Sequence, residues 1–316
     1  MSSKNSNKLM SLEEAIKKFV NDGDTVFLGG YYCRTVMSAI CEIARQKKRN
    51  LTIIHPNTAH EVEWLIAAGC VKRLIFTVFA AWTGTAKCFR RAVEHGIPNK
   101  IEIEEYTNLS LPMMLMAGAY GIPFIPVKDM RGSDLLKYRG FMGENKAKTI
   151  INPFTSEEVL VVPSLNPDVA IVHVQQADPE GNAQIWGIAD NCEFGAKASK
   201  RVIVTAERIV DREMISRDPD RTKIPGYRVN AVVESPWGAH PYAVPGFYDI
   251  DLEFHAYWSQ MSQTVETTEK FLEEWVYTPK DRYEYIDYYI KKFGYEKLKR
   301  LTGTNPYYSF SVNYGW

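Results

Sequence analysis

Two spacings of apolar residues alternate along the chain. Short apolar runs, typical of buried strands, are separated by segments in which apolar residues recur every three to four positions, as on one face of a helix. Alternation of strand and helix predicts an α/β fold built from βαβ units with a mainly parallel sheet. The expected strands cover residues 25–28, 51–54, 71–79, 101–104, 159–162, 169–172, 200–205 and 230–233. The expected helices cover residues 12–20, with Ser11 as its cap, 36–46, 61–68, 83–94 and 113–119.

Residues 169–187 form the most informative local pattern. A β-branched apolar run at 169–172 is typical of a fully buried strand in a parallel sheet. His173, Gln175 and Gln176 follow at its carboxyl end, and turn residues at 178–182 lead into a second short strand. Ligands of open α/β sheets bind beyond the carboxyl ends of the strands, so these side chains are candidates for ligand binding. Satisfaction of backbone groups at the strand end is an equally good interpretation of this pattern.

A diglycine, Gly29-Gly30, ends the expected strand at 25–28 and precedes a helix. A loop without side chains lets a ligand approach the backbone closely. No complete nucleotide-binding motif accompanies the diglycine, so a nucleotide site is only weakly indicated.

Two further loops are candidates for binding. Gly238, Ala239 and His240 follow the expected strand at 230–233, where small residues can frame a ligand and His240 can supply a polar contact; a simple turn is equally compatible. Residues 129–158 are irregular and mixed in charge. The segment that precedes them, at 122–127, is expected to be extended. Long irregular stretches inside compact proteins are more often functional than idle.

Composition narrows the classes of partner. Lys plus Arg and Asp plus Glu both number 38, giving a formal net charge of zero, so neither nucleic acid nor a membrane surface is expected as the main partner. The five cysteines are odd in number and lack CxxC spacing, which argues against a disulfide framework and a zinc site. No apolar run approaches the ~18 residues of a membrane span, and we expect no signal peptide. We expect a cytoplasmic protein.

The sequence contains no familiar catalytic set. There is no GxSxG elbow, Cys33 and Cys88 lack a nucleophile context, and the six histidines are isolated, so no metal site is expected. Carboxylate chemistry is what remains. Glu105 lies where an expected strand gives way to a loop, and a partly desolvated carboxylate there can act as a base or nucleophile on a carbonyl group. An exposed acid on a solvated face, beside Glu102 and Glu104, is the competing interpretation.

Four segments together resemble one known family. They are SLEEAIKKFVNDGDTVFLGG at 11–30, VHVQQADPEGNAQIWG at 172–187, RVIVTAERIV at 201–210 and NAVVESPWGAHP at 230–241. In this order they are similar to the A subunit of glutaconate-type, class I CoA-transferases, roughly from Leu12 to Trp275. The resemblance implies an open α/β sheet packed in layers with flanking helices. It also implies a partner B subunit in a hetero-oligomer, A2B2 or larger, with the active site at the interface.

The resemblance further implies a mechanism in which a B-subunit glutamate attacks an acyl-CoA thioester and carries CoA as a glutamyl thioester to an acceptor acid. Dicarboxylates are among the candidate acids, CoA is a substrate, and no permanently bound cofactor is implied. This chain has His55-Pro56-Asn57 at the corresponding position, so it lacks the nucleophile. Glu144 lies in a Gly-Glu-Asn triplet that superficially resembles the family's glutamate motif, but no strand precedes it. The residues implied to line the site are Gly29, Gly30, Gln175, Gln176, Gly238, Ala239 and His240.

Related CoA-thioester hydrolases that open rings in steroid breakdown provide an alternative. They depend on an A-subunit glutamate, and Glu105 falls on that position. Gly132-Ser133-Asp134 also resembles the hydrolase pattern, which makes Ser133 a candidate, whereas residues 175–187 and 235–241 are more similar to the transferase. A non-catalytic subunit that binds CoA or another ligand is a third hypothesis. We expect a single domain over residues 1–316, with a helical, aromatic-rich extension from about residue 264 that packs on the domain or on a partner.

Overall fold

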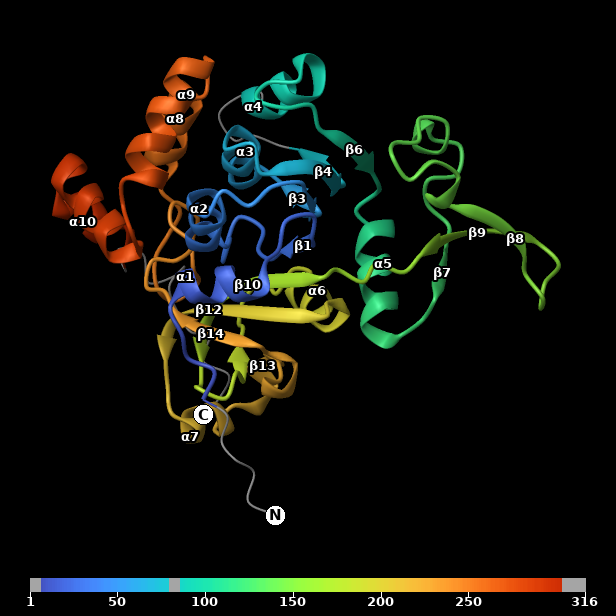
Figure 1. Cartoon of the computed structure of the whole chain (residues 1–316). Helices are drawn as coiled ribbons and strands as arrows, with labels where there is room; N and C mark the ends of the chain where they lie inside the picture. Colours follow the sequence, from blue (N-terminus) through green and yellow to red (C-terminus); the bar gives the residue numbers. More distant parts are fainter. Residues whose placement is uncertain (1–6, 80–85, 303–316) are drawn as a thin grey trace.

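The computed structural model describes residues 7–79 and 86–302. Within them, a mostly parallel sheet runs through the centre of the molecule (Figure 1). Its order is β14-β12-β10-β1-β2-β4-β6, and two short antiparallel strands, β11 and β13, extend from β10. The strands of this main sheet are β1 (Thr25–Leu28), β2 (Leu51–Ile54), β4 (Val71–Phe76), β6 (Glu102–Glu105), β10 (Val169–Ala177), β11 (Ala183–Gln184), β12 (Arg201–Ile209), β13 (Thr222–Ile224) and β14 (Ala231–Glu234).

The sheet grows outward from β1 in two directions. β1 pairs in parallel with β2 on one side and with β10 on the other, where Val26 lies opposite Val169. β4 and β6 continue the first direction, and β12 and β14 continue the second. The chain order therefore reverses between β1 and β10. In open α/β sheets such a switch point, at the carboxyl ends of the strands, is the usual ligand site.

Helices cover both faces of the main sheet (Figure 1). Alternate side chains of β10 divide between the two cores, as the period of a strand requires: Ile171 joins the first core, and Ala170 and Val172 join the second. The first core is covered by α1 (Leu12–Phe19), α2 (Met37–Arg45), α3 (His60–Ala67), α4 (Lys87–Arg90), α8 (Leu252–Met261), α9 (Val265–Leu272), α10 (Arg282–Phe293) and α11 (Tyr295–Leu301). The second is covered by α5 (Ser110–Tyr120) and α6 (Cys192–Ala198), while the short α7 (Arg212–Ser216) lies beyond β12.

A small antiparallel sheet, β7-β9-β8, projects from the body beside α5 (Figure 1). Its strands are β7 (Phe124–Val127), β8 (Lys148–Ile151) and β9 (Glu158–Pro163). Two-residue strands, β3 (Asn57–Thr58) and β5 (Val78–Phe79), form a further parallel pair.

The predicted α/β fold is confirmed, with two corrections to its elements. The strand expected over 71–79 is interrupted because the N–H of Thr77 donates to the carbonyl of Pro56 and turns the chain out of the main sheet. The stretch 129–158 is not irregular throughout, since it contains β8, all four residues of which are exposed. The segment at 122–127 is extended as expected, and its residues 124–127 pair with β9 in the small sheet. Part of the helix expected over 83–94 lies outside the described residues.

The late aromatic residues pack on the domain. Phe271 lies 5.0 Å from Trp64 between ring centroids, and the Trp275 and Tyr289 side chains are fully buried. Helical structure here already begins at Leu252, before the expected extension. The aromatic residues from 307 onward lie outside the described residues, and the single-domain organisation stays a prediction. None of the described helices combines the length and apolarity that crossing a bilayer requires.

Candidate active site at the carboxyl edge of the sheet

The parallel strands bring most of the predicted site residues to one edge. The carboxyl ends of parallel strands meet at the same side of a sheet. The residues at or just beyond these ends are Gly29 and Gly30 after β1, His55 after β2, Glu105 at the end of β6, Gln175 and Gln176 near the end of β10, and Gly238, Ala239 and His240 after β14. Segments far apart in the sequence are thus assembled into one candidate active site.

Gly29 and Gly30 make the tight turn at the switch point. A Cβ on Gly29 would lie 2.9 Å from the Val172 side chain, so the residue packs directly on β10. Gly30 has a φ of +97°, and a Cβ there would come within 2.5 Å of the Arg34 carbonyl oxygen. The diglycine therefore serves to fold the chain back on itself beside β10. Its predicted contact with a ligand stays a prediction.

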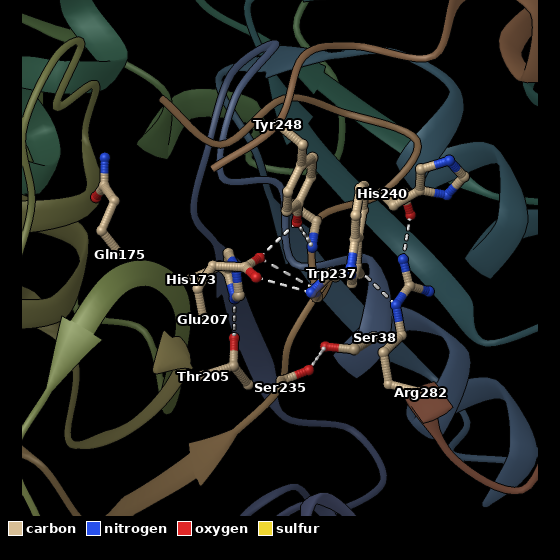
Figure 2. Close-up of polar contacts among 12 residues, drawn as sticks. Ser38, His173, Gln175, Thr205, Glu207, Ser235, Trp237, His240, Tyr248 and Arg282 are labelled. Carbon is tan, nitrogen blue, oxygen red and sulfur yellow. Dashed lines mark hydrogen bonds and ion pairs between the residues drawn. The ribbon is translucent and has the colours of Figure 1, made fainter. Parts of the chain in front are cut away.

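The loop after β14 is held by one buried carboxylate, that of Glu207 on β12 (Figure 2). Its Oε2 accepts from the N–H of Trp237 at 2.7 Å, and its Oε1 accepts from the N–H of Gly238 at 3.2 Å and from the hydroxyl of Tyr248 at 2.5 Å. Oε1 also lies 2.7 Å from Nε2 of His173, whose Nδ1 contacts the Thr205 hydroxyl. Residues from two strands, β10 and β12, are therefore coupled to the predicted binding loop.

Within this loop, Gly238 leaves no room for a side chain. A Cβ there would lie 2.6 Å from Cε1 of His173 and 2.6 Å from the Ser235 carbonyl oxygen. The N–H of the neighbouring Ala239 donates to the hydroxyl of Tyr248 at 3.1 Å. Packing inside the chain therefore requires glycine at position 238, since the residues 238–240 are buried. Contact of this loop with a ligand stays a prediction.

The His240 ring points away from the edge and into the helical layer. Its Nδ1 contacts the Tyr285 hydroxyl at 3.0 Å, and its Nε2 lies 3.3 Å from Asp251 Oδ2. Burial lowers the pKa of His240 to about 4, although the Asp251 carboxylate opposes this effect. The backbone carbonyl of His240 accepts from Arg282 (Figure 2). In this chain His240 therefore anchors its loop to α10, and a direct ligand contact stays a prediction.

The two predicted glutamines point to opposite faces of β10. Both polar atoms of the Gln176 amide have partners, because Nε2 donates to Gln184 at 2.6 Å and Oε1 accepts from Arg208 at 2.7 Å. Gln175 donates to the Trp186 carbonyl at 2.9 Å, but its buried Oε1 has no hydrogen-bond partner among the described residues. Figure 2 shows Gln175 apart from the Glu207 network. Of the two, Gln175 is the one with a free acceptor for a ligand.

Glu105 is exposed at the end of β6, whereas its neighbour Glu104 is fully buried. Glu104 Oε1 lies 2.9 Å from Nζ of the equally buried Lys146. Its oxygens also accept from the N–H groups of Gly140 and Met142. This ion pair fixes the long loop before β8 against the end of β6.

Ser133 lies in the same long loop. Its hydroxyl donates to the Met130 carbonyl at 2.6 Å, and the side chain is half-buried. The structure gives it no contact with the other site candidates, all of which lie in the described ranges, so its role stays a prediction. Glu144, in the short 3-10 turn η3 (Gly143–Asn145), is exposed and paired with Arg139 at 2.5 Å.

At the position implied for the family's glutamate, His55 is buried and paired with an acid of α3. Its Nδ1 contacts the Leu28 carbonyl at 2.8 Å, and its Nε2 lies 2.9 Å from Glu61 Oε1. Burial alone would lower the pKa of His55, but the Glu61 carboxylate raises it above the ordinary value. The Tyr242 hydroxyl completes the group by donating to Glu61.

Sequence reasoning missed this group, and it missed the Glu207 network. His55 and Glu61 are six positions apart, but the other partners are tens to hundreds of positions apart, so local spacing does not reveal the groups. One signal was available, because Glu207 is a charged residue that directly follows the apolar part of β12.

No other chemistry competes at this edge in the described part of the chain. The described residues contain no group of three or more His, Cys, Asp or Glu side chains that could hold a metal ion. All five cysteines are free and buried. Burial raises the pKa of Cys192 to about 11, so its thiol stays protonated.

Comparison with known proteins identifies the family. Residues 9–235 match the family model for coenzyme A transferase. The A subunit of glutaconate CoA-transferase from Acidaminococcus fermentans is 38% identical over 93% of this chain and 94% of its own length. The corresponding subunit of 3-oxoadipate CoA-transferase from Pseudomonas knackmussii is 36% identical over 88% of this chain and 96% of its own length. An uncharacterized Archaeoglobus fulgidus protein is 37% identical over 93% of this chain, which spans only 65% of that protein.

A solved structure supports the same family assignment. The crystal structure of the A. fermentans glutaconate CoA-transferase superposes with a TM-score of 0.89 at 37% identity, covering 96% of this chain and 98% of that one. A cholesterol ring-cleaving hydrolase IpdA subunit from Rhodococcus jostii is more distant, at 26% identity over 92% of this chain and 98% of its own length. The resemblance and the layered fold expected from the sequence are thus confirmed, and the chain belongs to the coenzyme A transferase family.

Proposed function

We propose that this chain is the A subunit of a heteromeric CoA-transferase, and that its partner B subunit supplies the glutamate nucleophile. The observation that carries the proposal is the state of the buried acids at the edge. Glu61, Glu104 and Glu207 are each buried and already hydrogen-bonded or ion-paired within the chain. A nucleophilic carboxylate must be partly desolvated yet free to attack, and none of these three is free. The buried acids at this edge therefore serve the structure of the chain, and in the proposal the reacting carboxylate comes from the partner subunit.

In the proposed reaction, a carboxylate oxygen of the partner's glutamate attacks the thioester carbonyl of acyl-CoA, and the CoA thiolate leaves to give a mixed anhydride. The thiolate then attacks the glutamyl carbonyl, forming the glutamyl-CoA thioester and releasing the first acid as its carboxylate. The acceptor carboxylate runs the same steps in reverse. This chain's part is to bind and orient the acyl group and to exclude water, since water would hydrolyse both intermediates.

The remaining features of the proposal follow from the family. We place the site at the interface with a B subunit in a hetero-oligomer, A2B2 or larger, with CoA as a substrate rather than a bound cofactor. The wall of the site is formed by Gly29, Gly30, Gln175, Gln176 and the loop at 238–240. Two relatives are named for glutaconate and 3-oxoadipate, both dicarboxylic acids, which supports a dicarboxylate substrate. The five free thiols support a cytoplasmic location.

A hydrolase is the second candidate, and the exposure of Glu105 favours it. Glu105 stands at the carboxyl end of β6 with an exposed side chain, so a water molecule can reach it. In this alternative Glu105 acts as a general base that removes a proton from the water attacking a CoA thioester. Replacement of Glu105 by Ala should then abolish turnover while the complex still assembles. Glu102→Ala, at the exposed opposite end of β6, is the matched control.

The purified complex with the B subunit separates these candidates. CoA transfer to an added carboxylate and release of free CoA are measured in parallel from the same acyl-CoA. Transfer that depends on the acceptor, together with inactivation by borohydride only after acyl-CoA is added, is expected for the transferase. Acceptor-independent CoA release that is lost in Glu105→Ala would overturn the transferase proposal in favour of the hydrolase. Binding of CoA with neither activity would instead indicate a ligand-binding subunit.

A further inference from the structure

Arg34 is a buried cation that meets no anion within the described residues. It follows the diglycine turn at the switch point and has no exposed surface (0%). Nη2 donates to the carbonyl of Ile188, and Nη1 lies 3.6 Å from the Cys33 sulfur, a weak acceptor. In the ranges 7–79 and 86–302, Nε has no hydrogen-bond partner. A guanidinium has five N–H groups, so most of its donors are left unused.

Other arginines of the described chain do not share this combination. Arg282 also lacks an ion pair there, but it donates to the carbonyls of Trp237 and His240 and stacks on Tyr285 at 3.9 Å. Arg228 has an unpartnered Nε as well, yet it is only half-buried, and its Nη2 donates to the carbonyls of Lys197 and Ser199. A buried charge without a counterion is strongly unfavourable, and such groups are retained where a partner arrives.

A second buried polar atom, Oε1 of Gln175, also lacks a hydrogen-bond partner among the described residues. The Gln175 side chain contacts the carbonyls of Trp186 and Pro245, and the described residues offer its Oε1 no partner. Arg34 contacts the same two segments, through the Ile188 carbonyl and through its N–H, which donates to Ala243 at 2.7 Å. Arg34 and Gln175 each carry a polar atom without a partner among the described residues, and both residues contact the segments 186–188 and 243–245.

The backbone around Arg34 is strained. Tyr32, Arg34 and Asp190 have φ values of +55°, +53° and +49°, which residues other than glycine rarely adopt. Strained backbone of this kind is concentrated at ligand-binding sites. Ile188 covers Nη2 of Arg34 and is itself 66% exposed, so Arg34 lies one residue below the surface.

We propose that Arg34 binds the distal carboxylate of a dicarboxylic acyl group and so selects dicarboxylates over monocarboxylates of equal length. This inference rests on the proposed function and specifies its substrate class. Nε and Nη2 lie on one side of the guanidinium, and that edge matches the two oxygens of a carboxylate. The incoming carboxylate replaces the Ile188 carbonyl at Nη2 and occupies the unused Nε.

The test compares substrates that differ only at the far end. For the complex with the B subunit, kcat/KM is measured for glutaryl-CoA and for pentanoyl-CoA with acetate as acceptor, and the ratio of the two is the selectivity. Arg34→Met should lower this ratio roughly 10- to 100-fold, as loss of charged hydrogen bonds implies, with Arg34→Lys in between. Arg228→Met, at the opposite end of the strands, is the matched control and should leave the ratio unchanged.

Three results would overturn the inference. One is an unchanged ratio in Arg34→Met. Another is failure of both Arg34 variants to assemble with the B subunit, since the anion would then belong to the partner. The third is an equal loss of selectivity in Asp190→Asn, since Arg34 would then act by neutralising Asp190.

A binding measurement keeps this inference separate from the proposed function. Free glutarate should raise the Tm of the wild-type complex, free pentanoate should not, and Arg34→Met should abolish the difference. A complex that binds glutarate through Arg34 but transfers no CoA would contradict the proposed function and support the inference. A complex that transfers CoA without this glutarate effect would do the reverse.

Discussion

Replacing Glu207 by Gln tests whether one carboxylate holds the candidate binding loop. Its two oxygens accept from Trp237, Gly238 and Tyr248 and contact His173. An amide supplies only one acceptor oxygen. If its NH2 group replaces Oε2, it faces the N–H of Trp237 across 2.7 Å, and if it replaces Oε1, it faces the N–H of Gly238 across 3.2 Å. No orientation of Gln satisfies all of them.

The expected cost follows from this geometry. A hydrogen bond to a charged group contributes about 1.5–3 kcal/mol, and a buried N–H left without an acceptor costs about 1–3 kcal/mol. Because the contacts share one carboxylate, they do not add fully. We therefore expect Glu207→Gln to lower the free energy of unfolding by about 3–5 kcal/mol. Trp237, held with a φ of +58° and stacked on Tyr248 at 4.3 Å, should lose its fixed conformation first.

Urea denaturation measures the free energy of unfolding, and hydrogen exchange by mass spectrometry reports on the peptide covering 235–242. Glu102→Gln is the matched control, because it removes a charge from an exposed ion pair with Arg73. It should cost less than about 1 kcal/mol. If Glu207→Gln proved as stable as Glu102→Gln, with unchanged exchange at 235–242, the reasoning about the loop would be wrong.

Three further predictions concern stability and the site. Gly238→Ala places a Cβ within 2.6 Å of His173, so it should displace the loop and lower kcat/KM of the complex at least roughly 10-fold in a steady-state transfer assay. Lys146→Met leaves Glu104 buried without its cation and should cost about 3–5 kcal/mol by urea denaturation, and a loss below about 1 kcal/mol would count against the pair. Burial raises the pKa of Glu63 from 4.5 to about 7, so the folded state keeps a proton that the unfolded state loses, and stability should fall as pH rises between these values. Glu63→Gln should remove up to about 3 kcal/mol of this dependence, measured by denaturation at about pH 5 and about pH 8.

The sequence indicated those strands whose side chains are buried on both faces. β1, β2 and β10 stand out because a strand covered by helices on both sides contains a run of apolar residues, and their order implied a parallel sheet. β8 escaped notice because all its residues are exposed in the projecting sheet, so no core imposes a pattern on it. The break at Thr77 depends on the Pro56 carbonyl, a partner that local sequence does not reveal.

The candidate site was predictable in its location but not in its internal contacts. Gly29, Gly238 and Gln175 follow or end strands, and parallel strands end together, so their meeting at one edge follows from topology. The pairing of Glu207 with His173 depends on the register of β10 and β12, which local sequence does not reveal. Arg34 is unusual because its Nε has no hydrogen-bond partner in the described part of the chain, and no sequence motif predicts the lack of a partner.

The most direct test of the proposed function is the location of the covalent intermediate. The complex with the B subunit is mixed with acyl-CoA, quenched, and digested for peptide mass spectrometry. The account predicts an unmodified peptide containing Glu105 in this chain, together with a CoA adduct on a glutamate of the B subunit. An adduct on this chain, or turnover of acyl-CoA with no adduct on either chain, would contradict it.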